Sequence, residues 1–481
     1  MENGMELQQE VYYVLRTQIQ FGVYRFGERL PTIEDAARLF MVSVKTIRAA
    51  YRQLQREGYI TISKSVGVKV SVSYSGQDSE ACIRKFFAGR KDALMDLGQS
   101  IQPLFSNAQW LGFKHASPEL LDQVEQLSAS NESMRPYVMI QQLQAIYGNL
   151  GNDMLNRLVW KTLMFFLTPF LSVSGNLNLL NQNQNPLLQM ITLCREQNWT
   201  ALRASVEAFQ GQKEIALRQF YENGVRLPAS DQQAVFSWSP YKKASQICYS
   251  LSMELLVEMS QGVYPTDSLL PSLNTLAREK HISLNTARRA IALLNDIGAA
   301  KSVNGVGTKV LPPEQITENC DFSQPSVHKR LLTHVKSVHI LTLSCRQVAE
   351  ATLSSIDQKT AEKWKAGIII CAQQQRHELV PYTIIERISQ DSPLATVRMV
   401  YTELFRLLLW GYPLRGLLED RQKYTAVYIP YFQPILDCLE RRDVEGFSAN
   451  LEAMMQHEIR LIVKRLIGLG LEEAAGLVLD E

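Results

Sequence analysis

The chain has 481 residues and carries 50 Lys and Arg against 48 Asp and Glu, a formal net charge of +2. Its seven cysteines are spaced singly without a C-x-x-C pair, which excludes a zinc finger and suits reduced cytosolic thiols. The sequence has no Walker loop, no G-x-G-x-x-G after a predicted strand, no H-E-x-x-H and no G-x-S-x-G. We therefore expect a protein that is not an enzyme and has no cofactor.

One segment occurs twice in the chain. Residues 22–70 align without a gap to residues 262–310, and 17 of the 49 positions are identical. A repeat at half the chain length indicates two copies of a multi-domain unit rather than a solenoid of short modules.

Each copy is preceded by a predicted amphipathic helix. Apolar residues recur in steps of four, which places them on one helical face. They are Leu7, Val11, Leu15 and Ile19 in the first copy, and Ile247, Leu251, Leu255 and Met259 in the second. Gly22 and Gly262 are expected to end these helices. The first helix therefore already belongs to a folded domain, and we expect no N-terminal signal segment.

Two further helices are predicted in each copy. A Leu-Pro pair at 30–31 and 270–271 interrupts the chain, and the following Thr or Ser can cap a short helix over 33–40 or 273–280. Ser43 and Ser283 are the expected caps of a third helix that ends near Gly58 or Gly298. Two helices joined by a tight turn have the outline of a helix-turn-helix.

The period then changes to two, which is typical of strands. In the first copy, strands are predicted over 59–63 and 68–72 with a turn at 64–67. In the second copy, residues 301–303 and 308–311 flank a turn at 304–307. A helix, a helix-turn-helix and a hairpin in this order make a winged helix.

These residues resemble the GntR family of bacterial transcription factors. The first copy carries Gly22-Val23-Tyr24, Gly27, Arg29-Leu30-Pro31-Thr32, Val42-Ser43, Thr46-Ile47-Arg48, Leu54, Glu57-Gly58 and Gly67. The second carries Gly262-Val263-Tyr264, Leu270-Pro271-Ser272, Ser283, Thr286, Arg288-Arg289, Gly298 and Gly305-Val306-Gly307. The resemblance implies a transcriptional regulator that binds a double-stranded DNA operator. A winged helix used only for protein contacts is the alternative.

The first turns of the third helix would face base edges in the major groove, and the hairpin would lie near the DNA backbone or the minor groove. The candidate residues in the first copy are Arg29, Ser43, Lys45, Thr46, Arg48, Lys64, Gly67 and Lys69. Those in the second are Ser283, Asn285, Thr286, Arg288, Arg289, Asn304, Gly305, Gly307 and Lys309. For any single one of them, an exposed and solvated side chain is the alternative.

The two copies depart from the family and from each other. Val44 and Leu284 occupy the place where the family usually has Arg, and Leu269 replaces Arg29 in the second copy. Lys45 and Ala49 of the first copy correspond to Asn285 and Arg289 of the second. Different side chains at equivalent positions predict two half-sites that are not identical.

Charge is concentrated on the repeated segments. Residues 1–75 hold ten Lys and Arg and seven Asp and Glu, and residues 241–312 hold eight and five. Each segment is therefore +3, and the remainder of the chain carries about −4, the difference between +2 and +6. Basic domains attached to a slightly acidic remainder favour phosphate contact by the former.

The regions between and after the copies have helical patterns. Leu187, Met190, Ile191 and Cys194 share one face, followed by Leu202, Val206 and Phe209, and Phe447, Leu451 and Met454 repeat the second set. The offset here is 245 rather than 240, which places about five extra residues between the repeated segment and the helical region of the second half. Each helical region is large enough for one core.

The helical regions resemble the effector domain of the fatty-acid-regulator branch of GntR proteins. The resemblance rests on Cys438-Leu439, Asp443, Phe447, Met454 and His457. Many such domains hold a metal with one Asp and three His. Here the Asp and His of the fourth helix would fall at Met139 and Leu143 in the first half, and at Ile384 and Ile388 in the second half. Gln212 is at the position of the first half that corresponds to His457. A lone His cannot assemble a divalent site, so we expect no metal.

The apolar run from Leu158 to Leu171 is too short to cross a membrane, contains Lys161 and is interrupted by Pro169. We expect a buried core helix and no contact with a membrane. The run could also line an apolar effector pocket, and packing is the preferred interpretation.

These patterns predict a mainly α protein with small β-wings, made by internal duplication. We expect a winged helix at residues 1–75 (head 1), a helical domain at 76–235 (body 1), a second winged helix at 241–312 (head 2) and a second helical domain at 318–481 (body 2), with a linker over 223–243 between the halves.

The predicted function is that of a cytoplasmic, nucleoid-associated bacterial regulator whose two heads act as an internal pseudo-dimer on one operator and whose bodies respond to a small-molecule effector. The alternatives are a homodimer with four heads, and a ligand-independent DNA-binding or scaffold protein whose bodies mediate only association.

Overall fold

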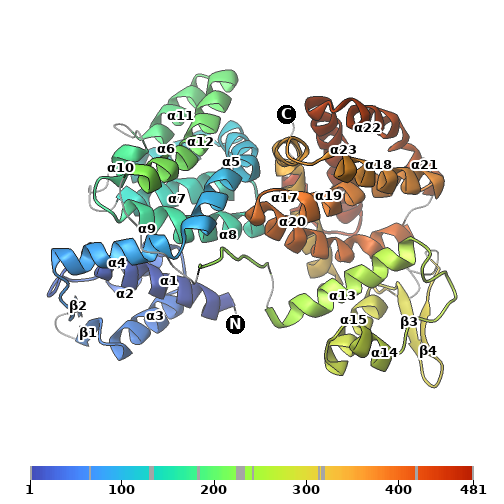
Figure 1. The fold of residues 1–481 in the computed structure, drawn as a ribbon, viewed down its shortest axis with the longest axis horizontal. Coiled ribbons are helices and arrows are strands. Elements are labelled where there is room, and N and C mark those ends of the chain that lie inside the picture. Colours follow the sequence, from blue (N-terminus) through green and yellow to red (C-terminus); the bar gives the residue numbers. More distant parts are fainter. Residues whose placement is uncertain are drawn as a thin grey trace. The chain divides into compact units, whose positions relative to one another are not determined.

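The computed structural model describes residues 3–63, 67–128, 135–180, 185–223, 233–240, 243–312, 315, 320–417 and 421–478. The chain divides into two compact units, Met1–Trp238 and Ser239–Glu481 (Figure 1). Each unit contains one head and one body, so the division falls within the predicted linker. Residues 224–232 of that linker lie outside the described part.

Unit 1 is helical apart from one hairpin. Its elements are α1 (Asn3–Gln20), α2 (Ile33–Phe40), α3 (Val44–Arg56), β1 (Ile60–Ser63), β2 (Gly67–Val70), α4 (Gly76–Ala88), α5 (Lys91–Lys114), α6 (Pro118–Leu127), α7 (Arg135–Gly148), α8 (Asp153–Thr162), the π-helix η2 (Leu163–Leu167), α9 (Thr168–Leu171), α10 (Asn176–Leu179), α11 (Pro186–Arg195) and α12 (Trp199–Asn223).

Unit 2 has the same plan. Its elements are α13 (Lys243–Ser260), α14 (Leu273–Glu279), α15 (Leu284–Asp296), β3 (Ala300–Val303), β4 (Gly307–Val310), α17 (Pro325–Leu353), α18 (Gln358–Gln373), η4 (His377–Leu379), α19 (Val380–Asp391), α20 (Ala395–Leu407), η5 (Leu408–Leu417), α21 (Arg421–Ala426), α22 (Ile429–Arg441), α23 (Val444–Gly468) and η6 (Glu472–Leu477).

The predicted winged helices are confirmed. Each hairpin is antiparallel, with Ile60 opposite Val70 in one and Ala300 opposite Val310 in the other. Gly22 and Gly262 follow the first helices with φ of +78° and +80°, a left-handed conformation that glycine adopts without strain. Each head therefore consists of three helices and a two-stranded wing.

One residue of the predicted apolar stripes is misplaced. Ile247 is 56% exposed, whereas Cys248, Leu251 and Leu255 of the same helix are buried. The buried face of α13 therefore consists of Cys248 and the residues three, four and seven positions later, Leu251, Ser252 and Leu255. The hydroxyl of Ser252 donates a hydrogen bond to the carbonyl of Ala290 in α15. The step-of-four prediction had the correct helix but started one residue too early.

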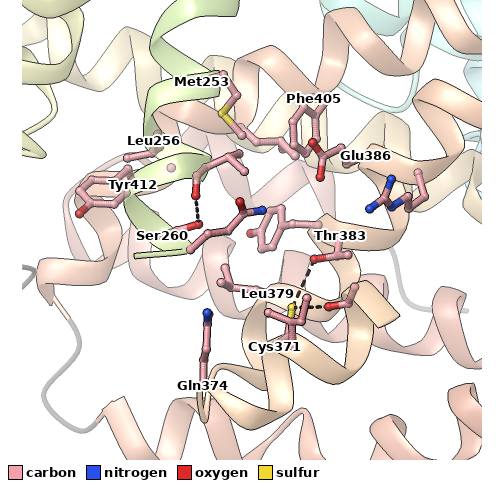
Figure 2. Close-up of a pocket in the computed structure, with 18 of the residues that line it drawn as sticks. Met253, Leu256, Ser260, Cys371, Gln374, Leu379, Thr383, Glu386, Phe405 and Tyr412 are labelled. Carbon is pink, nitrogen blue, oxygen red and sulfur yellow. Dashed lines mark hydrogen bonds between the residues drawn. The ribbon is translucent and has the colours of Figure 1, made fainter. Parts of the chain in front are cut away.

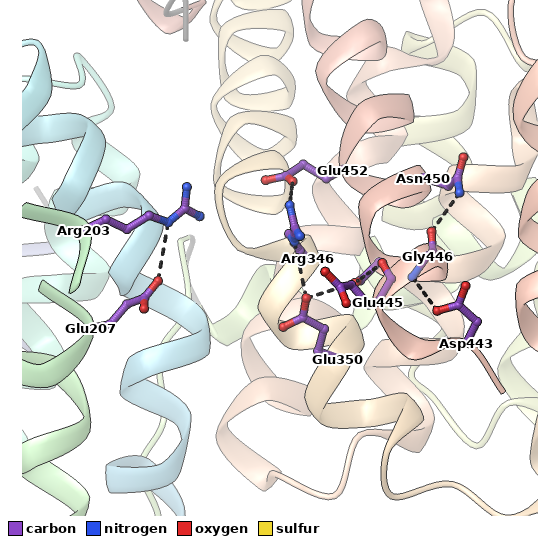
Figure 3. A network of polar contacts seen from close by, with 10 residues as sticks. Arg203, Glu207, Arg346, Glu350, Asp443, Glu445, Gly446, Asn450 and Glu452 are labelled. Atoms are coloured by element: carbon purple, nitrogen blue, oxygen red, sulfur yellow. Dashed lines mark hydrogen bonds and ion pairs between the residues drawn. The ribbon is translucent and has the colours of Figure 1, made fainter. Parts of the chain in front are cut away.

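The long helices α5 and α12 form the centre of body 1, and α17 and α23 form the centre of body 2. Arg346 of α17 makes ion pairs with Glu350 and with Glu452 of α23, while Arg203 and Glu207 pair within α12 (Figure 3). The predicted apolar faces of α11, α12 and α23 are buried.

The predicted insertion between head 2 and body 2 is wrong. Ser117 and Asp357 cap α6 and α18 and are still 240 residues apart, whereas α12 and α23 begin at Trp199 and Val444, which are 245 apart. The five additional residues therefore lie after the start of α18, which has 16 residues against 10 in α6. Sequence matches late in the bodies reveal the change in offset but do not locate it.

The positions considered as metal ligands are occupied by core residues. Met139, Leu143, Ile384 and Ile388 are all buried. His457 is half-buried, and its ring lies edge-on against Tyr428 at 6.4 Å. Among the residues that the structure describes, no three His, Cys, Asp or Glu side chains are placed to share a metal ion.

The apolar run of residues 158–171 spans the end of α8, the π-turn η2 and α9. Most of its side chains are buried, including Trp160, Phe166 and Phe170, which confirms a core position. In the described part of the chain, no helix combines the length and the apolar character that a membrane crossing requires.

Head 1 is attached to body 1 by buried polar contacts. The indole N–H of Trp160 donates to the carbonyl of Phe40 at 2.8 Å, and the hydroxyl of Tyr137 donates to Gln18 at 2.7 Å. Lys161 makes an ion pair with Glu10 in which both side chains are largely buried. These contacts join α1 and α2 of the head to α7 and α8 of the body.

Head 2 is attached to body 2 through other residues. Arg330 of α17 pairs with Asp296 at 3.0 Å, and Arg376 donates to the carbonyl of Ser260 at 3.2 Å. The ring of Tyr249 in α13 lies edge-on against Trp410, with centroids 5.5 Å apart. The two heads therefore share a fold but not their contacts with the bodies.

Candidate nucleic-acid interface

The turn before the third helix has the same geometry in both heads. The hydroxyl of Ser43 accepts from the backbone N–H of Thr46 at 3.1 Å, and Ser283 accepts from Thr286 at 3.0 Å. In the turn after the second helix, Met41 or His281 takes a left-handed conformation with φ near +50°. Both predicted caps are confirmed, and each satisfies a backbone donor at the start of the third helix.

A row of basic residues lies on the free face of α3. Lys45, Arg48, Arg52 and Arg56 are exposed and follow one another at spacings of three, four and four, which places them on one face. Residues on the opposite face, such as Ile47 and Leu54, are buried. The helix carries four basic and no acidic residues, so it presents four positive charges to solvent.

The corresponding helix of head 2 is much less basic. In α15, Asn285, Arg288 and Arg289 are exposed, and the helix ends in Asp296, so two basic residues and one acidic residue leave a charge of +1. Arg52 is replaced by Ala292 and Arg56 by Asp296. The two recognition helices therefore differ by three charges, four minus one.

Two of the candidate residues in each head are engaged in the helix cap itself. The hydroxyls of Ser43 and Thr46 lie 2.8 Å apart, and Thr46 is only 5% exposed. Ser283 and Thr286 form the same pair at 2.8 Å, with Thr286 half-buried. The free protein therefore presents Lys45, Arg48, Asn285, Arg288 and Arg289 more openly than either threonine.

The wing is joined to the segment before the second helix. The backbone of Arg29 forms an isolated antiparallel bridge with Lys69, and that of Leu269 forms one with Lys309. The second strand of each hairpin therefore has a short second neighbour besides the first strand. Leu269 of head 2 thus stands at the backbone position that Arg29 holds in head 1.

The wing turns depend on glycine. Gly67 has φ of +84°, and Gly305 and Gly307 have +74° and +130°. Asn304 is exposed in the turn of head 2. Lys64 lies outside the described residues. All three φ values are ones that L side chains rarely adopt, and Gly307 is the most constrained because its φ lies far from the left-handed α region near +60°.

An acidic residue sits beside the wing of head 2. Asp267 forms an ion pair with Lys309, with 2.7 Å between its Oδ1 and the Nζ of the lysine, and its backbone φ is +69°. The equivalent position in head 1 is Gly27, with φ of +79°, and no ion pair of Lys69 is found in the described part of the chain. The carboxylate of Asp267 therefore offsets the charge of a predicted phosphate-contacting lysine in head 2 alone.

Three residues that bear on this surface were not identified from the sequence. Arg52 and Arg56 continue the basic row of α3 beyond its first turns, and their helical spacing from Arg48 was a signal that could have found them. Asp267 could be recognised only after its backbone conformation and its partner Lys309 were known.

Comparison with known proteins supports the fold of the heads. Residues 7–70 and 250–310 both match the family model described as bacterial regulatory proteins, gntR family. No curated protein sequence matches the chain.

Solved structures with some likeness include Streptococcus agalactiae GntR, with 15% identity and a TM-score of 0.21, over 44% of this chain and 99% of that one. E. coli McbR/YncC has 16% identity and a TM-score of 0.23, over 45% and 99%. A putative GntR regulator from Rhodococcus sp. RHA1 has 14% identity and a TM-score of 0.25, over 45% and 97%.

The two matched segments coincide with the two winged helices, and each contains the capped recognition helix and the glycine-dependent wing. Both heads therefore belong to the gntR family of bacterial regulatory proteins, and the chain carries this DNA-binding domain twice.

Proposed function

We propose that the chain is a sequence-specific DNA-binding transcriptional regulator whose two heads read two different half-sites of one operator. The observation that carries this proposal is the pair of gntR-type winged helices with exposed basic residues on the free face of the recognition helix. Arg48 and Arg288 are equivalent and exposed, and each would contact a guanine base, because Arg can donate two hydrogen bonds to that base edge.

The half-sites should differ in strength as well as in sequence. Head 1 offers Arg29 and the four basic residues of α3, whereas head 2 offers fewer charges and a lysine paired with Asp267. Phosphate contacts supply most of the non-specific affinity, so head 1 would supply the larger share of binding.

One chain would occupy one operator, because it already contains the two heads that a regulator with one head per chain obtains by dimerising. Light scattering on the complex with a minimal operator tests the stoichiometry, and one chain per duplex is expected. Two chains per duplex would instead indicate a homodimer with four heads.

The bodies would adjust DNA binding in response to a small molecule, in the cytoplasm and on the nucleoid. The second candidate is a ligand-independent regulator or scaffold whose bodies serve association only. It is favoured by the apolar residues Met139, Leu143, Ile384 and Ile388 at the expected ligand positions. A screen of metabolites by thermal shift, followed by operator titration with each hit, separates the two: a ligand that changes operator affinity supports the regulator.

A further inference from the structure

A cavity of about 410 Å³ lies in unit 2 where the first helix of head 2 meets body 2 (Figure 2). Met253, Leu256 and Ser260 of α13 line it from the head, and Thr383, Glu386 and Phe405 line it from the body. This volume is within the range of small-molecule sites, which are mostly apolar with a few polar groups.

The equivalent place in unit 1 is filled by aromatic rings. Phe21, at the end of α1, lies 5.4 Å from Phe86 and 6.1 Å from Phe87, both of which belong to α4. Phe87 in turn contacts Phe170 and Phe220 of body 1. The aromatic side chains of helix α4 therefore fill the space between head 1 and body 1, and we call this cluster of Phe21, Phe86, Phe87, Phe170 and Phe220 the aromatic plug.

Unit 2 is built differently at this point. The position of Phe21 is taken by Gln261, an exposed residue that lines the cavity. The described residues between β4 and α17 contain no helix equivalent to α4. The cavity at this place is thus found in the second half, where Gln261 stands in place of Phe21. A cavity of about 560 Å³ where head 1 meets body 1 has a different lining, which includes Met41, Gln141 and Trp160.

Two of the residues that line the cavity have a buried polar atom without a hydrogen-bond partner. The Nδ1 atom of His334 is buried and has no hydrogen-bond partner among the described residues, and the residue is only 2% exposed. Its ring donates to the carbonyl of Leu407, and burial lowers the pKa of His334 to about 3, so the ring is neutral and Nδ1 is an acceptor.

Glycine at position 411 leaves the space that the His334 ring occupies. A Cβ atom there would come within 2.3 Å of the ring.

Two arginine residues supply positive charge to the cavity lining. The Nε atom of Arg387 is also buried without a partner, and Arg415 lies in the same lining. Glu386 is the opposing acid, but burial raises the pKa of its carboxyl group, which favours the uncharged form. The atoms without a partner are therefore Nε of the cationic Arg387, whose Nη1 donates to Gln390 at 3.3 Å, and Nδ1 of the neutral His334.

We propose that this cavity binds a small, mostly apolar molecule that carries one anionic group and one hydrogen-bond donor. The anionic group would accept from Arg387, and the donor would satisfy Nδ1 of His334. Because α13 forms one wall, the bound molecule would join head 2 to body 2. An effect of binding on DNA rests on the proposed function, whereas binding itself does not.

The probe for this test is anilinonaphthalene sulfonate, which combines apolar rings, one N–H donor and one sulfonate. Fluorescence titration of the full chain is expected to give one saturable site. Phenylnaphthylamine, which has the same rings and N–H but no sulfonate, should bind about tenfold more weakly, because a charge-assisted hydrogen bond is lost.

Two variants locate the site. Arg387→Met keeps an unbranched side chain, although a shorter one, and removes the guanidinium charge, and it should weaken sulfonate binding about tenfold or more while affecting the neutral probe much less. Gln261→Phe introduces the residue that head 1 has at this position and should weaken both probes. Arg460→Met changes an exposed arginine of the same body that does not line the cavity and should leave both affinities unchanged.

A cooperative melting transition is required of each variant before it is titrated, and Gln261→Phe alone decides the location if Arg387→Met does not fold. The proposal would be overturned if either Arg387→Met or Gln261→Phe folds and still binds the sulfonate with the wild-type affinity. The absence of a saturable site in the wild-type chain would also overturn it. Because no DNA is present, failure here leaves the proposed function untouched.

Discussion

The ion pair of Lys309 with Asp267 predicts that head 2 binds DNA more weakly than it would without the carboxylate of Asp267. We expect Asp267→Gly to strengthen binding by head 2, because it removes a carboxylate that lies 2.7 Å from Lys309 and would repel a nearby phosphate. Gly27→Asp should do the reverse in head 1, because Gly27 and Asp267 donate to equivalent carbonyls, of Val70 and Val310, with the same length of 3.0 Å.

The expected size follows from counterion release. One additional phosphate contact changes the slope of log K against log salt by about −0.9, which corresponds to roughly fivefold to tenfold in affinity near 0.1 M salt. Stability should change little. The ion pair is solvent-exposed at both ends, with 44% and 67% of the side chains accessible, and such pairs contribute about 0–1 kcal/mol. Relief of the left-handed Asp conformation offsets that loss by roughly 1 kcal/mol.

Fluorescence anisotropy on a duplex of random sequence, titrated at several salt concentrations, measures this effect and does not require the operator sequence. The matched control is Glu440→Gln, which breaks the ion pair with Lys365 in body 2 and changes the net charge by the same amount. An unchanged salt slope in both Asp267→Gly and Gly27→Asp, or an equal rise in Glu440→Gln, would refute the inference that the wing lysines contact phosphate.

Four further outcomes are expected. Trp160→Phe should destabilise unit 1 by about 1–3 kcal/mol in calorimetry, because the buried carbonyl of Phe40 loses its donor; an unchanged melt would contradict this. Ser43→Ala and Ser283→Ala should each cost about 1 kcal/mol of stability through loss of a helix cap, and equal stability to wild type would argue against that role. The carboxyl group of Glu458 accepts hydrogen bonds from Tyr382, Tyr424 and Tyr428, and burial raises its pKa in the folded protein. Glu458 therefore contributes its full stabilisation at a pH below the pKa of the unfolded state, and this stabilisation is lost as the pH rises through the pKa of the folded state. Urea unfolding should therefore favour wild type over Glu458→Gln more at pH near 4 than at pH 7, and a pH-independent difference would contradict it. Elemental analysis should find no stoichiometric Zn²⁺, Mn²⁺ or Ni²⁺, and about one metal per chain that disappears in His457→Ala would overturn this expectation.

Local signals accounted for the parts that the sequence predicted well. The helix at 33–40 was predicted with its observed bounds because a Leu-Pro pair and a capping threonine mark its start. Ser43 and Ser283 were recognised as caps because the hydroxyl and the backbone donor it serves are only three residues apart. The hairpins followed from alternation and glycine turns.

Features that depend on distant residues could not be predicted. The aromatic plug of unit 1 requires Phe21, Phe87 and Phe220 to meet across about 200 residues of sequence, and the corresponding cavity of unit 2 appears only where this packing is lost. The π-helix at 163–167 leaves no periodic signal in five residues. The ion pair of Asp267 with Lys309 depends on a left-handed residue that is not glycine.

The most direct test of the central claim, that both heads read DNA and do so differently, is selection of binding sites from random duplexes by the full chain, Arg48→Ala and Arg288→Ala. We predict a two-part site that is not a palindrome, in which each variant relaxes the sequence of one half and leaves the other intact, at a cost of about 1–3 kcal/mol. A strictly palindromic site that is damaged equally by either substitution would contradict the account, and so would the absence of any enriched sequence.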